Sequence, residues 1–94
     1  MNNTRRKEIR NIIDELETMA GRLDDLYSWL DELKSEEEEY RDNIPENLQG
    51  GIRYEESEEA SDNMEYASDA LYDLSLEMTN YIEDAISYLE NAAA

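Results

Sequence analysis

The 94-residue sequence predicts an all-α protein, an antiparallel hairpin of two long helices. Apolar residues recur at alternating steps of three and four over two long segments, which is typical of amphipathic helices that pack together. The only proline and two of the three glycines lie between these segments, within residues 40–54. The segments are similar in length, and a short connection makes neighbouring helices run in opposite directions.

The first helix is predicted over residues 4–41, with Thr4 as its N-cap. Its apolar residues form two rows with a spacing of seven, and these rows define the seam, the surface expected to contact the second helix. The two rows are Ile9, Leu16, Leu23 and Leu30, and Ile12, Met19, Leu26 and Leu33. Ile13, Ala20 and Tyr27 widen the apolar stripe, and a stripe of this width favours a helical bundle.

Residues 42–51 are predicted to form the connection. Pro45 disfavours helical angles at the residue before it, so the first helix should end near Asn43. The stretch PENLQGG is typical of a short helical turn that stops at its two glycines. The loop tip is a candidate partner-binding site made of Ile44, Pro45, Glu46, Asn47, Leu48 and Gln49. The alternative interpretation is that this segment only closes the end of the hairpin.

The second helix is predicted over residues 52–91. Its seam is expected to contain Ala60, Met64, Ala67, Leu71, Leu74, Met78, Tyr81, Ala85 and Tyr88. Residues 54–94 contain no Lys or Arg, so ion pairs within this segment cannot stabilise the helix and packing against the first helix must do so. Acidic residues at 55–59 lie near the helix start, where the helix dipole favours negative charge.

A turn centred near residue 47 predicts a register in which Leu16 faces Met78 and Ile12 faces Tyr81. This register places the cations of residues 5–10 near acidic residues 83–90, which would offset their unfavourable position at a helix N-terminus. Two helices alone bury little surface, so we expect two hairpins to dimerise into a four-helix bundle. The expected dimer contacts are Ile13, Tyr27, Trp29, Tyr66, Ala70, Ile82 and Ile86. An extended monomer is the alternative.

The composition excludes several classes of partner. With 26 acidic and 8 basic residues, the formal net charge is −18, which repels both nucleic acid and anionic membranes. The sequence has no Cys or His, so disulfides and thiolate or imidazole metal sites are excluded. No apolar run is long enough to cross a bilayer, and the N-terminal residues do not form a signal peptide. These features favour a cytoplasmic protein.

Acidic side chains provide the remaining candidate surfaces. An acidic ridge on the second helix has steps of three and four residues and contains Asp62, Glu65, Asp69, Asp73 and Glu77. An acidic cluster on the first helix contains Glu36, Glu37, Glu38 and Glu39. No carboxylate pair is distinguished by its sequence context, so we predict no catalytic residue and no enzyme activity. Neither the cluster at 36–39 nor the acidic stretch at 55–59 has the spacing of a calcium loop, so no metal site or cofactor is predicted. The simplest interpretation of the ridge is a solvated outer face.

A resemblance to known proteins rests on three segments, RRKEI near the start, EEEEYRDNIPENLQGG in the middle, and the acidic helix after it. Together they resemble a group of short acidic helical proteins of phages and prophages of Gram-positive bacteria. A loop close to D-N-x-P-E-N-L-Q-G-S recurs in that group, and Gly51 stands here in place of the serine. The resemblance implies a phage or mobile-element origin and implies no particular reaction.

The ridge and the resemblance together suggest a function. DNA carries a negative charge about every 1.7 Å of its axis, and carboxylates along a helix can occupy the groove that binds it. We therefore hypothesise a DNA mimic that inhibits a host nucleic-acid-handling or defence protein of the CRISPR or restriction type. Its partner would be a basic nucleic-acid-binding surface in the host cytoplasm. The alternatives are a sponge for a nucleotide signal, which would need Arg5, Arg6, Lys7, Arg10 and Arg53, and a structural adaptor.

Overall fold

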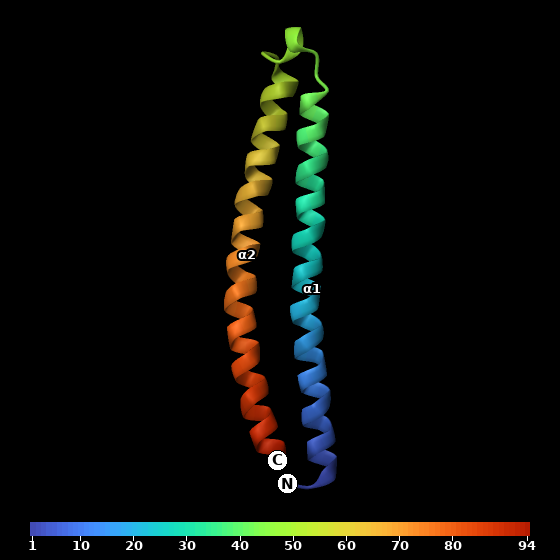
Figure 1. Cartoon of the computed structure of the whole chain (residues 1–94), viewed down its shortest axis with the longest axis vertical. Helices are drawn as coiled ribbons and strands as arrows, with labels where there is room; N and C mark the ends of the chain where they lie inside the picture. Colours follow the sequence, from blue (N-terminus) through green and yellow to red (C-terminus); the bar gives the residue numbers. More distant parts are fainter. The chain divides into compact units, whose positions relative to one another are not determined.

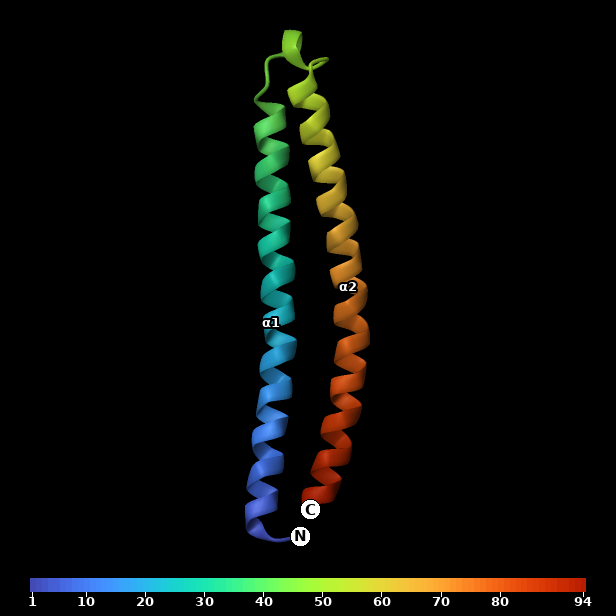
Figure 2. The same ribbon diagram turned by 180° about the vertical axis from the view of Figure 1, so that it is seen from behind.

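The computed structural model describes residues 1–94 and is all-helical (Figures 1 and 2). Helix α1 spans Asn3–Asp42, a short 3₁₀ helix spans Glu46–Leu48, and helix α2 spans Ile52–Ala93. The two long helices pack as a hairpin, which confirms the predicted fold class, and their ends lie within two residues of the predicted bounds. Neither helix combines the length and apolarity needed to cross a membrane.

The chain divides into two compact units. The terminal unit consists of residues 1–25 and 73–94, and the loop unit consists of residues 26–72. In each unit, one stretch of α1 lies beside one stretch of α2 in both views (Figures 1 and 2). The core of each unit is therefore the seam between two helices.

The start of α1 is capped by Asn2, because the backbone N–H of Arg5 donates to Asn2 Oδ1 at 2.8 Å. A side-chain oxygen in this position satisfies a backbone donor of the first turn, which is the role predicted for Thr4. Arg6 Nε donates to the carbonyl oxygen of Ala93 at 3.1 Å. This contact places a cation at the C-terminus of α2, where the helix dipole favours positive charge.

The cross-helix ion pairs predicted for the cations of residues 5–10 do not form. The chain contains a single ion pair, Lys34 Nζ to Glu38 Oε1 at 3.8 Å, and it lies within α1. The unfavourable position of Arg6 in the first turn of α1 is offset instead by its hydrogen bond to the last turn of α2. Electrostatic stabilisation at this end of the hairpin therefore comes from a helix terminus, not from carboxylates.

On α1 the seam uses one of the two predicted rows and replaces the other. Ile13 and Leu23 are buried, with 3% and 8% of their surface exposed, whereas Ile12 and Met19 are 49% and 51% exposed. The retained row is Ile9, Leu16, Leu23 and Leu30, and the second row is Ile13, Ala20, Tyr27, Lys34 and Arg41. The predicted second row of Ile12, Met19, Leu26 and Leu33 lies on the exposed surface, so that prediction was wrong.

On α2 the seam is built around serine. Ser57, Ser61 and Ser68 are buried, with 2%, 4% and 8% exposure, and Ser75 is half-buried. They alternate with Met64, Leu71 and Met78, and the seam continues through Ile82, Ala85 and Leu89. Small side chains leave room for the larger residues of α1, so this face of α2 is the one that packs. The predicted seam residues Leu74, Tyr81 and Tyr88 are exposed instead.

The register of the helices also differs from the prediction, by about one helical turn. In the loop unit, Arg41 is hydrogen-bonded to Ser57, where the predicted register placed residue 53 opposite it. Also in the loop unit, the rings of Tyr27 and Tyr72 lie 6.3 Å apart, whereas the predicted register placed residue 67 opposite Tyr27. In the terminal unit, Ser75 Oγ donates to Asp24 Oδ1 at 3.3 Å, whereas the predicted register placed residue 70 opposite Asp24.

The shift begins at the connection, where Ile52 and Arg53 in the first turn of α2 are exposed instead of packed in the seam. Ile52 and Arg53 share a cavity with Ile44, Pro45 and Leu48 of the loop. The hydrogen bonds between α1 and α2 begin about one turn later, at Ser57. Ile13, Tyr27 and Ile82 were predicted to lie beside the seam, as dimer contacts. All three lie in the seam of their own chain instead.

Gly21 offers a direct test of local helix stability. It lies inside α1, and a Cβ atom added there would meet nothing within 4 Å. We expect Gly21→Ala to raise the free energy of unfolding by about 1 kcal/mol, because glycine is the poorer helix former by about that amount. Urea denaturation followed by circular dichroism measures the change.

The matched control is Gly51→Ala. A Cβ atom at Gly51 would lie 3.1 Å from the carbonyl oxygen of Leu48, which already accepts the N–H of Gly51 at 3.0 Å. Alanine is also a poor residue before a helix start. Gly51→Ala should therefore give no gain, and an equal gain at both positions would contradict the local geometry described here.

Candidate functional site

The connection forms an apolar cavity of about 560 Å³ within the loop unit. Its lining residues are Tyr40, Asn43, Ile44, Pro45, Leu48, Gly51, Ile52 and Arg53. The 3₁₀ helix shapes one wall, since the N–H of Leu48 donates to Pro45 O at 2.8 Å. Gln49 Nε2 donates to Ile44 O at 3.3 Å and closes the turn. The predicted short helical turn is therefore present, and it folds over the end of its own unit.

The loop-tip residues do not act as one surface. Ile44, Pro45 and Leu48 line the cavity, and Leu48 is 57% exposed at its rim. Glu46 and Asn47 are exposed outside the cavity, and Gln49 is half-buried by its hydrogen bond to the loop backbone. The apolar half of the predicted tip is thus a pocket wall, while the polar half faces solvent.

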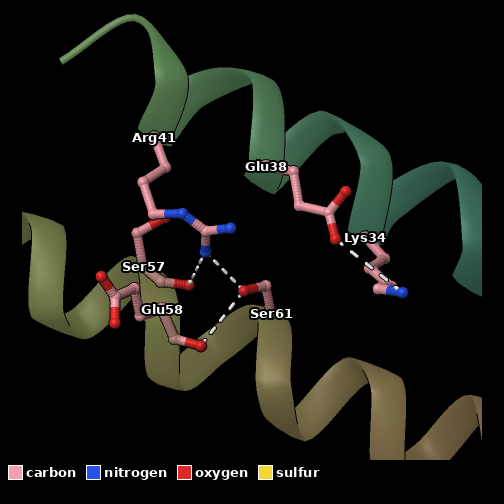
Figure 3. A network of polar contacts seen from close by, with 6 residues as sticks. All are labelled: Lys34, Glu38, Arg41, Ser57, Glu58 and Ser61. Carbon is pink, nitrogen blue, oxygen red and sulfur yellow. Dashed lines mark hydrogen bonds and ion pairs between the residues drawn. The ribbon is translucent and has the colours of Figure 1, made fainter.

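A polar contact network lies next to the cavity, between α1 and α2 (Figure 3). Arg41 Nη1 donates to the carbonyl oxygen of Ser57 at 3.3 Å and to Ser61 Oγ. Ser61 Oγ in turn donates to Glu58 O at 3.1 Å, and Ser57 Oγ donates to Glu37 O at 3.5 Å. The half-buried guanidinium of Arg41 therefore joins the two helices through hydrogen bonds to Ser57 and Ser61. In a hairpin with an apolar seam, Leu or Ile would occupy these positions.

The acidic ridge residues are all exposed. Asp62, Glu65 and Asp69 lie on the surface of the loop unit, and Asp73 and Glu77 lie on the surface of the terminal unit. None of them forms an ion pair in this structure. Glu77 also lines a second cavity, of about 410 Å³, in the terminal unit. Their exposure is the one expected of a solvated outer face, and a role in partner binding stays a prediction.

The acidic cluster on α1 is divided between two environments. Glu36 and Glu39 are exposed, whereas Glu37 and Glu38 are half-buried. Glu38 forms the ion pair with Lys34, and the backbone of Glu37 accepts the hydrogen bond from Ser57. No group of three or more Asp or Glu side chains lies close enough together to hold a metal ion.

Several residues of this region were not predicted to belong to the loop site, although Arg53 was named for the nucleotide-sponge alternative. Tyr40, Ile52 and Arg53 complete the loop cavity, and Arg41, Ser57 and Ser61 form the network beside it. A signal for the serines was present, because Ser57, Ser61, Ser68 and Ser75 are spaced by four and seven residues, which is a helical heptad pattern.

No protein-family model, curated protein or solved structure matches the chain.

Proposed function

We propose that this chain is an interaction protein that binds the basic, nucleic-acid-binding surface of another protein and thereby blocks it. The supporting observation is the set of exposed carboxylates on α2 that have no cation partner. Asp62, Glu65 and Asp69 are exposed in the loop unit, and residues 54–94 contain no Lys or Arg to neutralise them. Such a surface attracts cationic grooves at long range.

The spacing of these carboxylates is compatible with a partial imitation of a DNA strand. Three charges between Asp62 and Asp69 correspond to about one charge per 5 Å of helix, since each residue rises about 1.5 Å. One DNA strand carries about one charge per 3.4 Å. About two carboxylates therefore stand in for three phosphates, and a Lys or Arg groove can pair with most of them.

The partner class follows from the resemblance of the loop and flanking segments to phage and prophage proteins. A phage protein that mimics DNA acts against host proteins that bind DNA, so we propose a host nucleic-acid-handling or defence protein as the partner. Negative charge also disfavours direct binding to nucleic acid, because phosphate contacts need Lys and Arg. The chain would thus compete with nucleic acid instead of binding it.

The proposal includes a homodimer, in which two hairpins form a four-helix bundle. The chain exposes 7253 Å² of surface, whereas a folded monomer of its 11.0 kDa mass exposes about 5,600 Å². The excess of about 1,600 Å² exceeds the roughly 800 Å² that each partner buries in a standard interface. Association of two copies would cover this excess.

The experiment is a competition assay with purified restriction endonucleases and RNA-guided nucleases of a Gram-positive host, each bound to a fluorescent DNA duplex. We expect the chain to displace DNA from at least one of them, and to do so less well as salt is raised from 50 to 200 mM. The triple variant Asp62→Asn, Glu65→Gln, Asp69→Asn should be about tenfold weaker, at about 0.5 kcal/mol for each lost ion pair.

The matched control neutralises three exposed carboxylates of α1, in the variant Glu8→Gln, Asp25→Asn, Glu32→Gln, and so changes the net charge equally. Its competition should stay within about threefold of the unmodified chain. Equal losses in both triple variants would show that net charge, not the α2 surface, drives binding. Failure of the unmodified chain to displace DNA from any nuclease, even at a large excess, would contradict the proposed function.

A further inference from the structure

We infer that a second copy of this chain docks on an apolar face of the terminal unit, and this inference rests on the homodimer proposed above. The apolar face consists of Ile12 and Met19 on α1 and of Leu74, Tyr81 and Tyr88 on α2. Their exposed fractions are 49%, 51%, 46%, 73% and 75%. These are large apolar side chains, and single scattered residues of this kind are ordinary, whereas an ordered set marks an interaction surface.

The five residues are ordered by the helical repeat. Ile12 and Met19 are seven residues apart on α1, and Leu74, Tyr81 and Tyr88 are seven apart on α2. Each residue directly precedes a seam residue, as Ile12 precedes Ile13 and Tyr81 precedes Ile82. In two antiparallel helices that face each other, the residues before equivalent seam positions turn to the same side of the pair. Both rows therefore lie on one side of the terminal unit.

A cavity in this unit adjoins the α2 row. Leu74 and Tyr81 line the cavity of about 410 Å³ together with the seam residues Leu16, Met78 and Ile82. The helices thus leave an open, mostly apolar groove between the seam and the exposed row, with room for more than one side chain. A partner helix that packs on this side would insert its own residues there, as helices do in a four-helix bundle.

The charges beside the two rows are complementary to those of a second copy. Arg22 lies three residues after Met19, while Glu77 and Asp84 lie three residues after Leu74 and Tyr81, so each charge borders its row. Arg22 forms no ion pair within the chain. A two-fold axis that packs α1 of one copy on α2 of the other would bring Arg22 near these carboxylates twice, because such an interface is the same patch on both subunits.

The test is the molar mass of the full chain in solution, measured by light scattering over a range of concentrations. We expect twice the chain mass of 11.0 kDa. Leu74→Glu should shift the mass to that of one chain, because a carboxylate placed in a buried apolar interface loses its hydration. The matched control is Leu76→Glu on the same helix, which is 52% exposed but outside the apolar face, and it should remain dimeric.

Helicity measured by circular dichroism checks that both variants fold. The double variant Tyr81→Ala, Tyr88→Ala provides a second route to the monomer, since both side chains are more than 70% exposed within the chain and cost the hairpin little. A mass of one chain for the unmodified protein at several hundred micromolar and 0.5 M salt would overturn the inference. So would equal behaviour of Leu74→Glu and Leu76→Glu.

Salt separates this inference from the proposed function. Two copies with a net charge of −18 repel each other, so screening by salt should strengthen the dimer. The same salt should weaken competition with DNA. A dimer without competition would sink the proposed inhibition and leave the docking inference standing. Competition by a chain that stays monomeric would sink the homodimer and the docking inference, and would leave the proposed inhibition standing.

Discussion

Replacing Ile13 with alanine should lower the free energy of unfolding by about 2–4 kcal/mol, the usual cost of truncating a buried isoleucine. Only 3% of its surface is exposed, in the seam of the terminal unit. The same replacement at the neighbouring Ile12, which is 49% exposed, should cost less than about 1 kcal/mol. The two variants have the same composition, so helix propensity and net charge are identical in the comparison.

Urea denaturation at low micromolar concentration, where dissociation of a dimer limits the contribution of Ile12, provides the measurement. The result distinguishes two seams that the sequence pattern permits. A larger loss at Ile12 than at Ile13 would support the seam predicted from the steps of three and four, and would contradict the one described here.

Leucine in place of Ser57 should lower the free energy of unfolding by about 1–3 kcal/mol, the usual cost of adding volume to a filled interior. Ser57 is 2% exposed and lies under Arg41, whose guanidinium donates to its carbonyl oxygen. A leucine would have to displace that side chain, and the hydrogen bond from Ser57 Oγ to Glu37 O would be lost. The variant therefore both removes the hydrogen bond of the Ser57 hydroxyl and pushes the two helices apart.

The matched control is Ser87→Leu, at an exposed position of the same helix, where the change should stay within about 0.5 kcal/mol. Thermal and urea unfolding of both variants gives the comparison. Stabilisation by Ser57→Leu would mean that α1 and α2 can separate to accept a larger residue, and the close approach around serine would then be incorrect.

The long elements were predictable because their signals are local. The steps of three and four specify helices, and Pro45 with the neighbouring glycines specifies the break between them. The seam was not predictable in the same way. Ile12 and Ile13 are identical in type and adjacent in sequence, so the apolar stripe of α1 is compatible with either row. The partner surface decides between them, and its small serines look polar in a sequence pattern although they are buried.

The candidate site shows the same limit. The exposure of the α2 carboxylates was predictable, because a helix with one apolar stripe leaves its other faces to solvent. The loop cavity was predicted only in part, since Tyr40, Ile52 and Arg53 join it through the register of the helices. That register depends on the conformation of the connection as a whole, which no short motif encodes.

The serine row has a consequence for how the hairpin assembles. Buried apolar side chains occur only in the terminal unit, at Ile13, Leu23 and Ile82, while the buried side chains of the loop unit are serines. Forming the turn therefore buries little apolar surface. The buried apolar contacts instead join residues near the two ends of the sequence. Such distant contacts slow the folding reaction. In the native state, backbone amides of the loop unit should be the first to exchange their hydrogens with solvent.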